Sequence, residues 1–308
     1  MRSVSDRPDV ALVHLVRAVN GVEPFRQFIR SYDAHRAGCD HELVLLCKGF
    51  ERPELPPDWI DALGATAASL IFFSDAGMDI WCYFKAASRL RHRYLCFVNS
   101  WSRILADDWL AKLYHHGTMA GVGLVGASGA WFSLYTTNLL HHRQQSHLAA
   151  DAGSDESRLD ALRQYFPPFP NPYVRSNGFL IERSLFRSLR GGRGPTKIEG
   201  LLFELGADSM TRQVIARDLK VLVVGRDGLA YDPESWPASR TFRSGAQENL
   251  LVSDNRTEMY ARADGAAREA LAWTTWGDAA RDEAPTRLES LASLELDRIP
   301  AGARIFVG

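Results

Sequence analysis

Residues 94–103 read Tyr94-Leu-Cys-Phe-Val-Asn-Ser-Trp-Ser-Arg103, a short apolar run that ends in small polar residues. A helix start, Ala106-Asp-Asp-Trp-Leu-Ala-Lys-Leu113, follows at once. An apolar run of this length predicts a buried strand. Ligands of open α/β sheets bind just beyond the carboxyl ends of such strands, so we expect a ligand at the tip formed by residues 99–102.

The first half of the chain alternates between strand and helix patterns. The expected strands are Val10–Val16, Glu42–Cys47, Ala68–Phe73 and Tyr94–Val98, and the expected helices are Val22–His35, Asp58–Leu63, Ile80–Leu90 and Asp107–His115. This alternation predicts an α/β fold, in which a mostly parallel, Rossmann-like central sheet is flanked by helices and joined by right-handed crossovers.

The second half is less regular. We expect strands at Gly121–Gly126, Val174–Ile181 and Lys220–Val224, and helices within Leu139–Leu162, at Glu182–Leu189 and around Asp208–Arg217. The alternation stops near Tyr231, and Trp236, Phe242, Trp273 and Trp276 then predict a tail that packs on the body. We therefore predict one domain over residues 1–232 and a C-terminal extension over residues 233–308, with a helix at Thr286–Leu296 and an edge strand at Ala303–Val307.

The composition excludes several functional classes. The 308 residues carry a formal net charge of −1, which argues against a protein that binds nucleic acid through a basic surface. No apolar run approaches the ~20 residues of a membrane-spanning helix, and the N-terminus lacks the apolar core of a signal peptide. We expect a cytoplasmic protein; a peripheral position at the inner face of the membrane and a homo-oligomer both stay open.

Two pairs of acidic residues are candidates for ligand binding or acid–base chemistry. Asp75 and Asp79 flank Gly77 just past the third strand, where either can accept a hydrogen bond from a ligand base or sugar, and Asp79 is also suited to cap the next helix. Glu204 and Asp208 would share one face of a helix that began by Glu204. Like charges at that spacing raise a pKa, which suits a general base, although acids at a helix N-terminus also have a purely structural use.

Four segments resemble the motifs of a known family. Each match is loose, and the evidence for the resemblance is the order of the four segments along residues 8–230. They are Val13-His-Leu-Val-Arg-Ala-Val-Asn-Gly-Val-Glu-Pro-Phe25, Leu95–Leu110, Val174-Arg-Ser-Asn-Gly-Phe-Leu-Ile-Glu-Arg-Ser-Leu-Phe186 and Phe203–Val223. Together they resemble inverting, family 2-like glycosyltransferases with the GT-A fold.

The resemblance implies an enzyme that moves a sugar from a nucleotide-sugar donor to a hydroxyl of a glycan or lipid-linked acceptor, in bacterial-type surface polysaccharide synthesis. Asp208 best fits the place of the catalytic base, and Glu204 is next. The implied donor-binding residues are Asn20, Lys48, Asp75, Asp79, Asn99, Ser100 and Ser102. The implied acceptor-binding residues are Arg175, Asn177 and Trp101; Arg175 can pair with a phosphate or carboxylate, while the proline-rich crossing before it also fits plain packing.

The sequence departs from the family at its metal-binding D-x-D motif, which here is Asn99-Ser100-Trp101. Mg²⁺ and Mn²⁺ prefer anionic oxygen ligands, whereas Asn99 offers at most one neutral carbonyl and Trp101 offers none. Either the phosphates and an acid elsewhere hold the ion, or a cation such as Lys48 or Arg175 neutralises the leaving diphosphate.

Three other functions stay open. One is a catalytically inactive relative that binds a nucleotide-sugar or a glycan, and the missing D-x-D favours it. Another is a nucleotidyltransferase of similar architecture, for which Arg17–Gly21 is a poor phosphate loop. The last is an assembly module in envelope-glycan synthesis.

Overall fold

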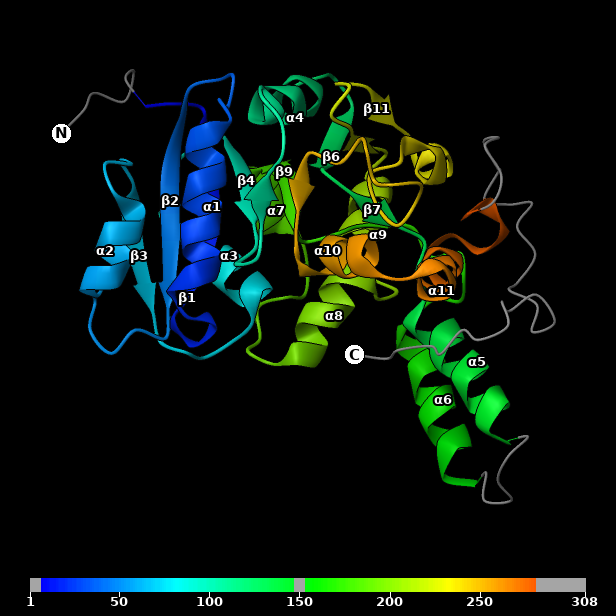
Figure 1. The fold of residues 1–308 in the computed structure, drawn as a ribbon. Helices are drawn as coiled ribbons and strands as arrows, with labels where there is room; N and C mark the ends of the chain where they lie inside the picture. The colour runs from blue at the N-terminus through cyan, green and yellow to red at the C-terminus, as the bar shows by residue number, and fades with distance from the viewer. Residues whose placement is uncertain (1–6, 147–152, 281–308) are drawn as a thin grey trace.

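The computed structural model describes residues 7–146 and 153–280, and its main feature is a central sheet (Figure 1). The sheet has eight strands in the order β11-β10-β6-β9-β4-β1-β2-β3. Its strands are β1 (Val10–Arg17), β2 (His41–Lys48), β3 (Ser69–Phe73), β4 (Tyr94–Val98), β6 (Val122–Gly126), β9 (Gly178–Glu182), β10 (Lys220–Val224) and β11 (Ala230–Tyr231). Strands β1 to β4 are parallel, as are β6 and β10, whereas β9 runs antiparallel to β4 and β6, and β11 to β10. The predicted mostly parallel α/β sheet is confirmed.

Helices cover both faces of this sheet. The helices of the described residues are α1 (Val22–Ala34), α2 (Pro57–Leu63), α3 (Asp79–Arg89), α4 (Trp109–Gly117), α5 (Leu134–Ser146), α6 (Gly153–Tyr165), α7 (Arg183–Ser188), α8 (Lys197–Leu205), α9 (Met210–Ile215), α10 (Asn255–Arg262) and α11 (Gly265–Trp276). Because side chains alternate along a strand, Leu12 packs with α1 and α4 on one face, while Val13 packs with α3 and α7 on the other. No helix in the described part of the chain has both the length and the apolar character needed to cross a membrane.

Three elements differ from the sequence prediction. The region within Leu139–Leu162 forms two helices, α5 and α6, which project together from the body (Figure 1). The strand expected at Val174–Ile181 divides into β8 (Tyr173–Val174) and β9, because the Ser176 N–H leaves the ladder and donates to the Glu204 carboxylate. Helix α8 was not predicted, although its capping box of Thr196 and Glu199 is a recognisable start signal.

The segment after Tyr231 joins the body through two small sheets and a shared core. β12 (Val252–Ser253) pairs with β5 (Arg103–Ile104), and β7 (Gly129–Ala130) pairs with β8. Trp236 and Trp276 are fully buried in the same hydrophobic core as the sheet. The domain boundary at residue 232 stays a prediction, and the helix and edge strand expected at 286–296 and 303–307 lie outside the described residues.

Candidate functional site

The carboxyl ends of β1, β2 and β3 bring two cations and an acid together. Arg17 and Lys48 are neighbours in the β1–β2 register, and Asp75 lies two residues beyond the end of β3. The Lys48 side chain is 1% exposed, and its Nζ donates to the Asp75 carboxylate and, at 2.7 Å, to the Asp75 carbonyl. Arg17 Nη2 lies 3.9 Å from the same carboxylate. The hydrogen bond from Lys48 lowers the pKa of Asp75, so this carboxylate is ionised at neutral pH.

Asp79 and Glu204 form an acidic pair at the same edge. Asp79 is the first residue of α3 and Met78 is the N-cap, so Asp79 does not occupy the N-cap position. The Asp79 carboxylate accepts a hydrogen bond from its own backbone N–H. Burial raises the pKa of Asp79, with Glu204 adding to the rise and with Arg17 and Lys48 opposing it. An acid whose pKa is raised by burial beside a second carboxylate is typical of functional sites.

A buried tyrosine extends this acidic pair. Tyr83 lies one helical turn after Asp79 on α3, and its hydroxyl is buried without a hydrogen-bond partner. Burial raises the pKa of Tyr83, and the charges of Asp79 and Glu204 add to the effect. The hydroxyl therefore stays protonated and is available as a hydrogen-bond donor beside two carboxylates.

Glu204 and Asp208 do not share a helix face, which corrects the sequence prediction. Glu204 lies in the last turn of α8, and its Oε1 accepts a 2.7 Å hydrogen bond from the Ser176 N–H. Asp208 follows the end of α8, and its two oxygens accept hydrogen bonds of 3.0 and 3.1 Å from the exposed Arg190 guanidinium. The buried Gln213 fixes that pair by donating to the backbone carbonyls of Arg190 and Asp208. Asp208 and Arg190 line a separate cavity of about 370 Å³, so Glu204 is the carboxylate that joins Asp79.

The tip after β4 is held by internal hydrogen bonds. Asn20 Nδ2 donates to Ser100 Oγ at 2.9 Å, which joins the β1 and β4 loops. Asn99 Oδ1 accepts from Trp101 N at 2.9 Å and from Ser102 Oγ at 3.1 Å. Ser102 is fully buried, whereas the Trp101 side chain is 43% exposed. Asn20, Ser100 and Trp101 therefore line the edge, whereas the Ser102 hydroxyl stabilises the loop by a hydrogen bond within it.

Two predicted acceptor residues are part of the framework. Arg175 is buried and donates to Asp254 at 2.7 Å and to Ser128 at 3.1 Å. The buried Asn177 accepts from Ser128 Oγ and donates to the Val252 carbonyl. Because their polar groups are already hydrogen-bonded to buried partners, Arg175 and Asn177 support the structure of the edge and do not offer free groups to an acceptor.

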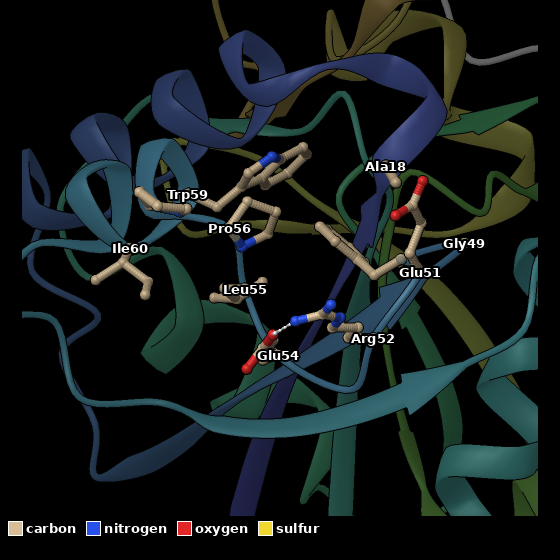
Figure 2. Close-up of a pocket in the computed structure, with 11 residues that line it drawn as sticks. Ala18, Gly49, Glu51, Arg52, Glu54, Leu55, Pro56, Trp59 and Ile60 are labelled. Atoms are coloured by element: carbon tan, nitrogen blue, oxygen red, sulfur yellow. Dashed lines mark ion pairs between the residues drawn. The ribbon is translucent and has the colours of Figure 1, made fainter.

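An aromatic cavity of about 670 Å³ opens beside the first two strands. Ala18 and Gly49, which directly follow β1 and β2, form one side, and Pro56 and Trp59 at the start of α2 form the other (Figure 2). Phe50 also lines it, with its ring edge-on to Trp59 at 5.0 Å. Gly49 also adjoins the polar cluster of Lys48 and Asp75, because a Cβ at position 49 would lie 3.1 Å from the Asp75 carboxylate. The size and lining suit a planar, largely apolar group.

The tip does not suit a divalent metal ion. Asn99 Oδ1 already accepts two hydrogen bonds, and the motif has no carboxylate. Within residues 7–146 and 153–280, no group of three or more His, Cys, Asp or Glu side chains is arranged to hold a metal. Mg²⁺ and Mn²⁺ need several hard oxygen ligands, so these side chains do not fit such an ion.

Sequence reasoning missed the cavity and two charged or polar residues at this edge, Arg17 and Tyr83. Arg17 ends the first strand, so the rule that selected Asn99 also applied to it. Phe50 and Trp59 flank the proline-rich loop after β2, but nothing in the sequence shows that they meet. Tyr83 had a detectable signal, because it lies one helical turn after Asp79.

No family model matches this chain, and no curated protein matches it. Solved structures do match. A mannosyltransferase from Pyrobaculum calidifontis, in complex with GDP-Man and Mn²⁺, has 10% identity and a TM-score of 0.41 over 76% of this chain and 61% of that one. Glucosyl-3-phosphoglycerate synthase from Mycobacterium tuberculosis has 16% identity and a TM-score of 0.43 over 71% and 70%. Core-mannan synthase A from Aspergillus fumigatus has 11% identity and a TM-score of 0.39 over 68% and 73%.

The chain thus spans about six tenths of the length of the mannosyltransferase that it matches. These matches are GT-A-type glycosyltransferases, the class that the sequence resembles.

Proposed function

We propose that this protein transfers a sugar from a nucleotide-sugar donor to a hydroxyl acceptor by single displacement, with inversion at the anomeric carbon. The observation that carries the proposal is the position of the aromatic cavity. It opens at the carboxyl ends of β1 and β2, on the sheet edge that also holds Asp79 and Glu204. A site for a planar base and a pair of carboxylates at one edge are what a nucleotide-sugar and a hydroxyl nucleophile need.

The donor lies along this edge. Its nucleoside base fills the cavity against Phe50 and Trp59, where aromatic contact supplies binding energy. Asp75, next to Gly49, accepts hydrogen bonds from the ribose hydroxyls, and the half-exposed Trp101 and the Asn20–Ser100 pair line the path of the phosphates. The sugar then reaches the region of Asp79 and Glu204.

Glu204 acts as the general base. One of its oxygens is held by the Ser176 N–H, and the other makes no hydrogen bond to the described residues. The free oxygen takes the acceptor proton while the acceptor oxygen attacks the anomeric carbon. Asp208 was the first choice from sequence, but its ion pair with Arg190 in a separate cavity makes Glu204 the better candidate.

The acceptor is a glycan or lipid-linked hydroxyl in surface polysaccharide synthesis. Its site is the part of the edge nearest Glu204 and Trp101, because the donor fills the other side. A catalytically inactive protein that only binds a nucleotide-sugar is the alternative, and it shares the cavity but not the need for a base.

The test combines binding with turnover. Uridine, guanosine, cytidine and thymidine diphosphate-sugars are added separately to the protein, and thermal unfolding and release of nucleoside diphosphate are both measured. One donor class is expected to raise the unfolding midpoint, since a ligand that binds only the folded state stabilises it. Binding together with turnover in the presence of glycan acceptors supports the enzyme. Binding without turnover supports the inactive alternative, and no binding by any donor refutes both.

A further inference from the structure

A positively charged cluster lies beside Glu204 and takes no part in the step described above. Its centre is Arg243, in the segment between η4 (Pro237–Ser239) and β12. Arg243 Nη1 donates to Thr275 Oγ1 at 3.3 Å, but its Nε is buried without a hydrogen-bond partner. A buried N–H that has lost water and gained no acceptor is costly, so this guanidinium is suited to a ligand that accepts from it.

The loop holds Arg243 in a strained conformation. Its φ is +46°, in the left-handed region that a residue with a long side chain adopts only at a cost of about 1–2 kcal/mol. The Arg243 N–H donates to Gln247 Oε1 at 3.0 Å, and the buried Gln247 is anchored in turn by a bond to the Thr257 carbonyl. The surrounding structure thus enforces the position of the guanidinium, as expected of a binding residue.

The positive charge of the cluster is only partly neutralised. The Phe242 ring contacts two guanidinium groups, that of Arg175 at 3.8 Å and that of Arg243 at 5.0 Å. Arg175 is paired with Asp254, whereas neither Arg243 nor the exposed Arg256 forms an ion pair with any described residue. Burial, together with the charges of Arg175 and Arg256, lowers the pKa of Arg243 to about 10, so the group is still a cation at neutral pH.

Tyr173 connects this cluster with Glu204. Burial raises the pKa of the Tyr173 hydroxyl, the charge of Glu204 adds to the rise, and Arg175, Arg243 and Arg256 oppose it. One phenol therefore lies within electrostatic range of the carboxylate and of all three arginines. Arg175 and Arg243 contact the same Phe242 ring, and Ser176, the residue after Arg175, donates to Glu204. Arg243 therefore lies near the proposed base, at the edge where the tip has no carboxylate for a metal ion.

We propose that Arg243 and Arg256 form a phosphate site that binds the diphosphate of the donor, in the role that a divalent ion would otherwise fill; this inference rests on the proposed function. The anomeric C–O bond breaks, its electron pair stays on the terminal phosphate oxygen, and the diphosphate gains one negative charge. The acceptor oxygen forms the new bond to carbon, and its proton goes to Glu204. A guanidinium matches phosphate with two parallel hydrogen bonds and keeps its charge throughout the step.

The test measures nucleotide affinity by calorimetry in the presence of EDTA. The ligands are the nucleoside diphosphate of the donor class, the matching monophosphate, inorganic phosphate and glycerol phosphate. The first variant, Arg243→Lys, keeps the positive charge. The second variant, Arg256→Gln, replaces an exposed side chain, so we expect it to fold as the wild type does. Arg262→Gln on the same helix is the matched control, because its exposed side chain pairs with Glu258 and with no other acid among the described residues. Thermal unfolding verifies that each variant is folded.

The wild type is expected to bind the diphosphate at least tenfold more tightly than the monophosphate without metal. Arg256→Gln and Arg243→Lys should each remove most of that preference and leave monophosphate binding unchanged, while Arg262→Gln keeps the preference. A preference that arises only after Mn²⁺ is added overturns the inference. So does a result in which Arg256→Gln weakens only glycerol phosphate or inorganic phosphate, because the site would then hold a phosphorylated acceptor. If the wild type binds no nucleotide at all, the proposed function itself fails.

Discussion

Replacing Glu204 with glutamine separates the two carboxylates that compete for the role of base. The substituted amide oxygen can still accept the Ser176 N–H, which the carboxylate now accepts at 2.7 Å. The stability of the fold should therefore change by less than about 1 kcal/mol, since no buried donor loses its acceptor. Loss of a general base, in contrast, typically costs about 10²- to 10⁴-fold in rate, which corresponds to roughly 3–5.5 kcal/mol of activation free energy.

The assay is steady-state release of nucleoside diphosphate in the presence of acceptor. The Glu204→Gln variant should lose turnover, and its KM for the donor should change little, because Glu204 does not line the aromatic cavity. Asp208→Asn is the matched control. It breaks only an exposed ion pair with Arg190, which contributes about 0–1 kcal/mol, and it should retain most of the activity. Full transfer by Glu204→Gln, with loss of transfer by Asp208→Asn, would refute the assignment.

Three further predictions concern the cavity, the core and the buried acid. Phe50→Leu should weaken binding of the nucleoside diphosphate by about 1–3 kcal/mol, the usual contribution of a base–aromatic contact, and unchanged affinity in calorimetry would place the nucleoside elsewhere. Trp276→Ala should lower the free energy of unfolding by about 3–5 kcal/mol in denaturant titration, because the indole is fully buried and its N–H bonds the Phe242 carbonyl; a loss below 1 kcal/mol would contradict its place in the shared core. Asp79→Asn should stabilise the protein increasingly as pH rises above about 4, the value for an unfolded aspartate. The raised pKa of Asp79 means that the wild type loses stability between its unfolded and folded pKa values. Equal unfolding midpoints of the two proteins at pH 4 and pH 8 would exclude this sign.

The sequence alone predicted every strand of the central sheet except β11, and most of the helices but not α8. Buried strands such as Tyr94–Val98 are continuous apolar runs, and amphipathic helices such as Val22–Ala34 have a clear period, so both are readable from local pattern. The same pattern located the edge where Lys48, Asp75 and Asn99 lie at or just beyond the ends of their strands, because parallel strands present their carboxyl ends together.

Only the tertiary structure decided which of the polar residues at that edge are free to act. Asn177 and Arg175 are candidates by residue type, yet buried partners more than 40 residues away in sequence already satisfy them. Glu204 became the preferred base because α8 ends after it and directs it to Ser176, whereas Asp208 turns to Arg190. Arg243 belongs to a segment that no local pattern assigns to the site. Hydrogen bonds and charge interactions between distant segments depend on tertiary packing, so they cannot be predicted from a residue's neighbours in sequence.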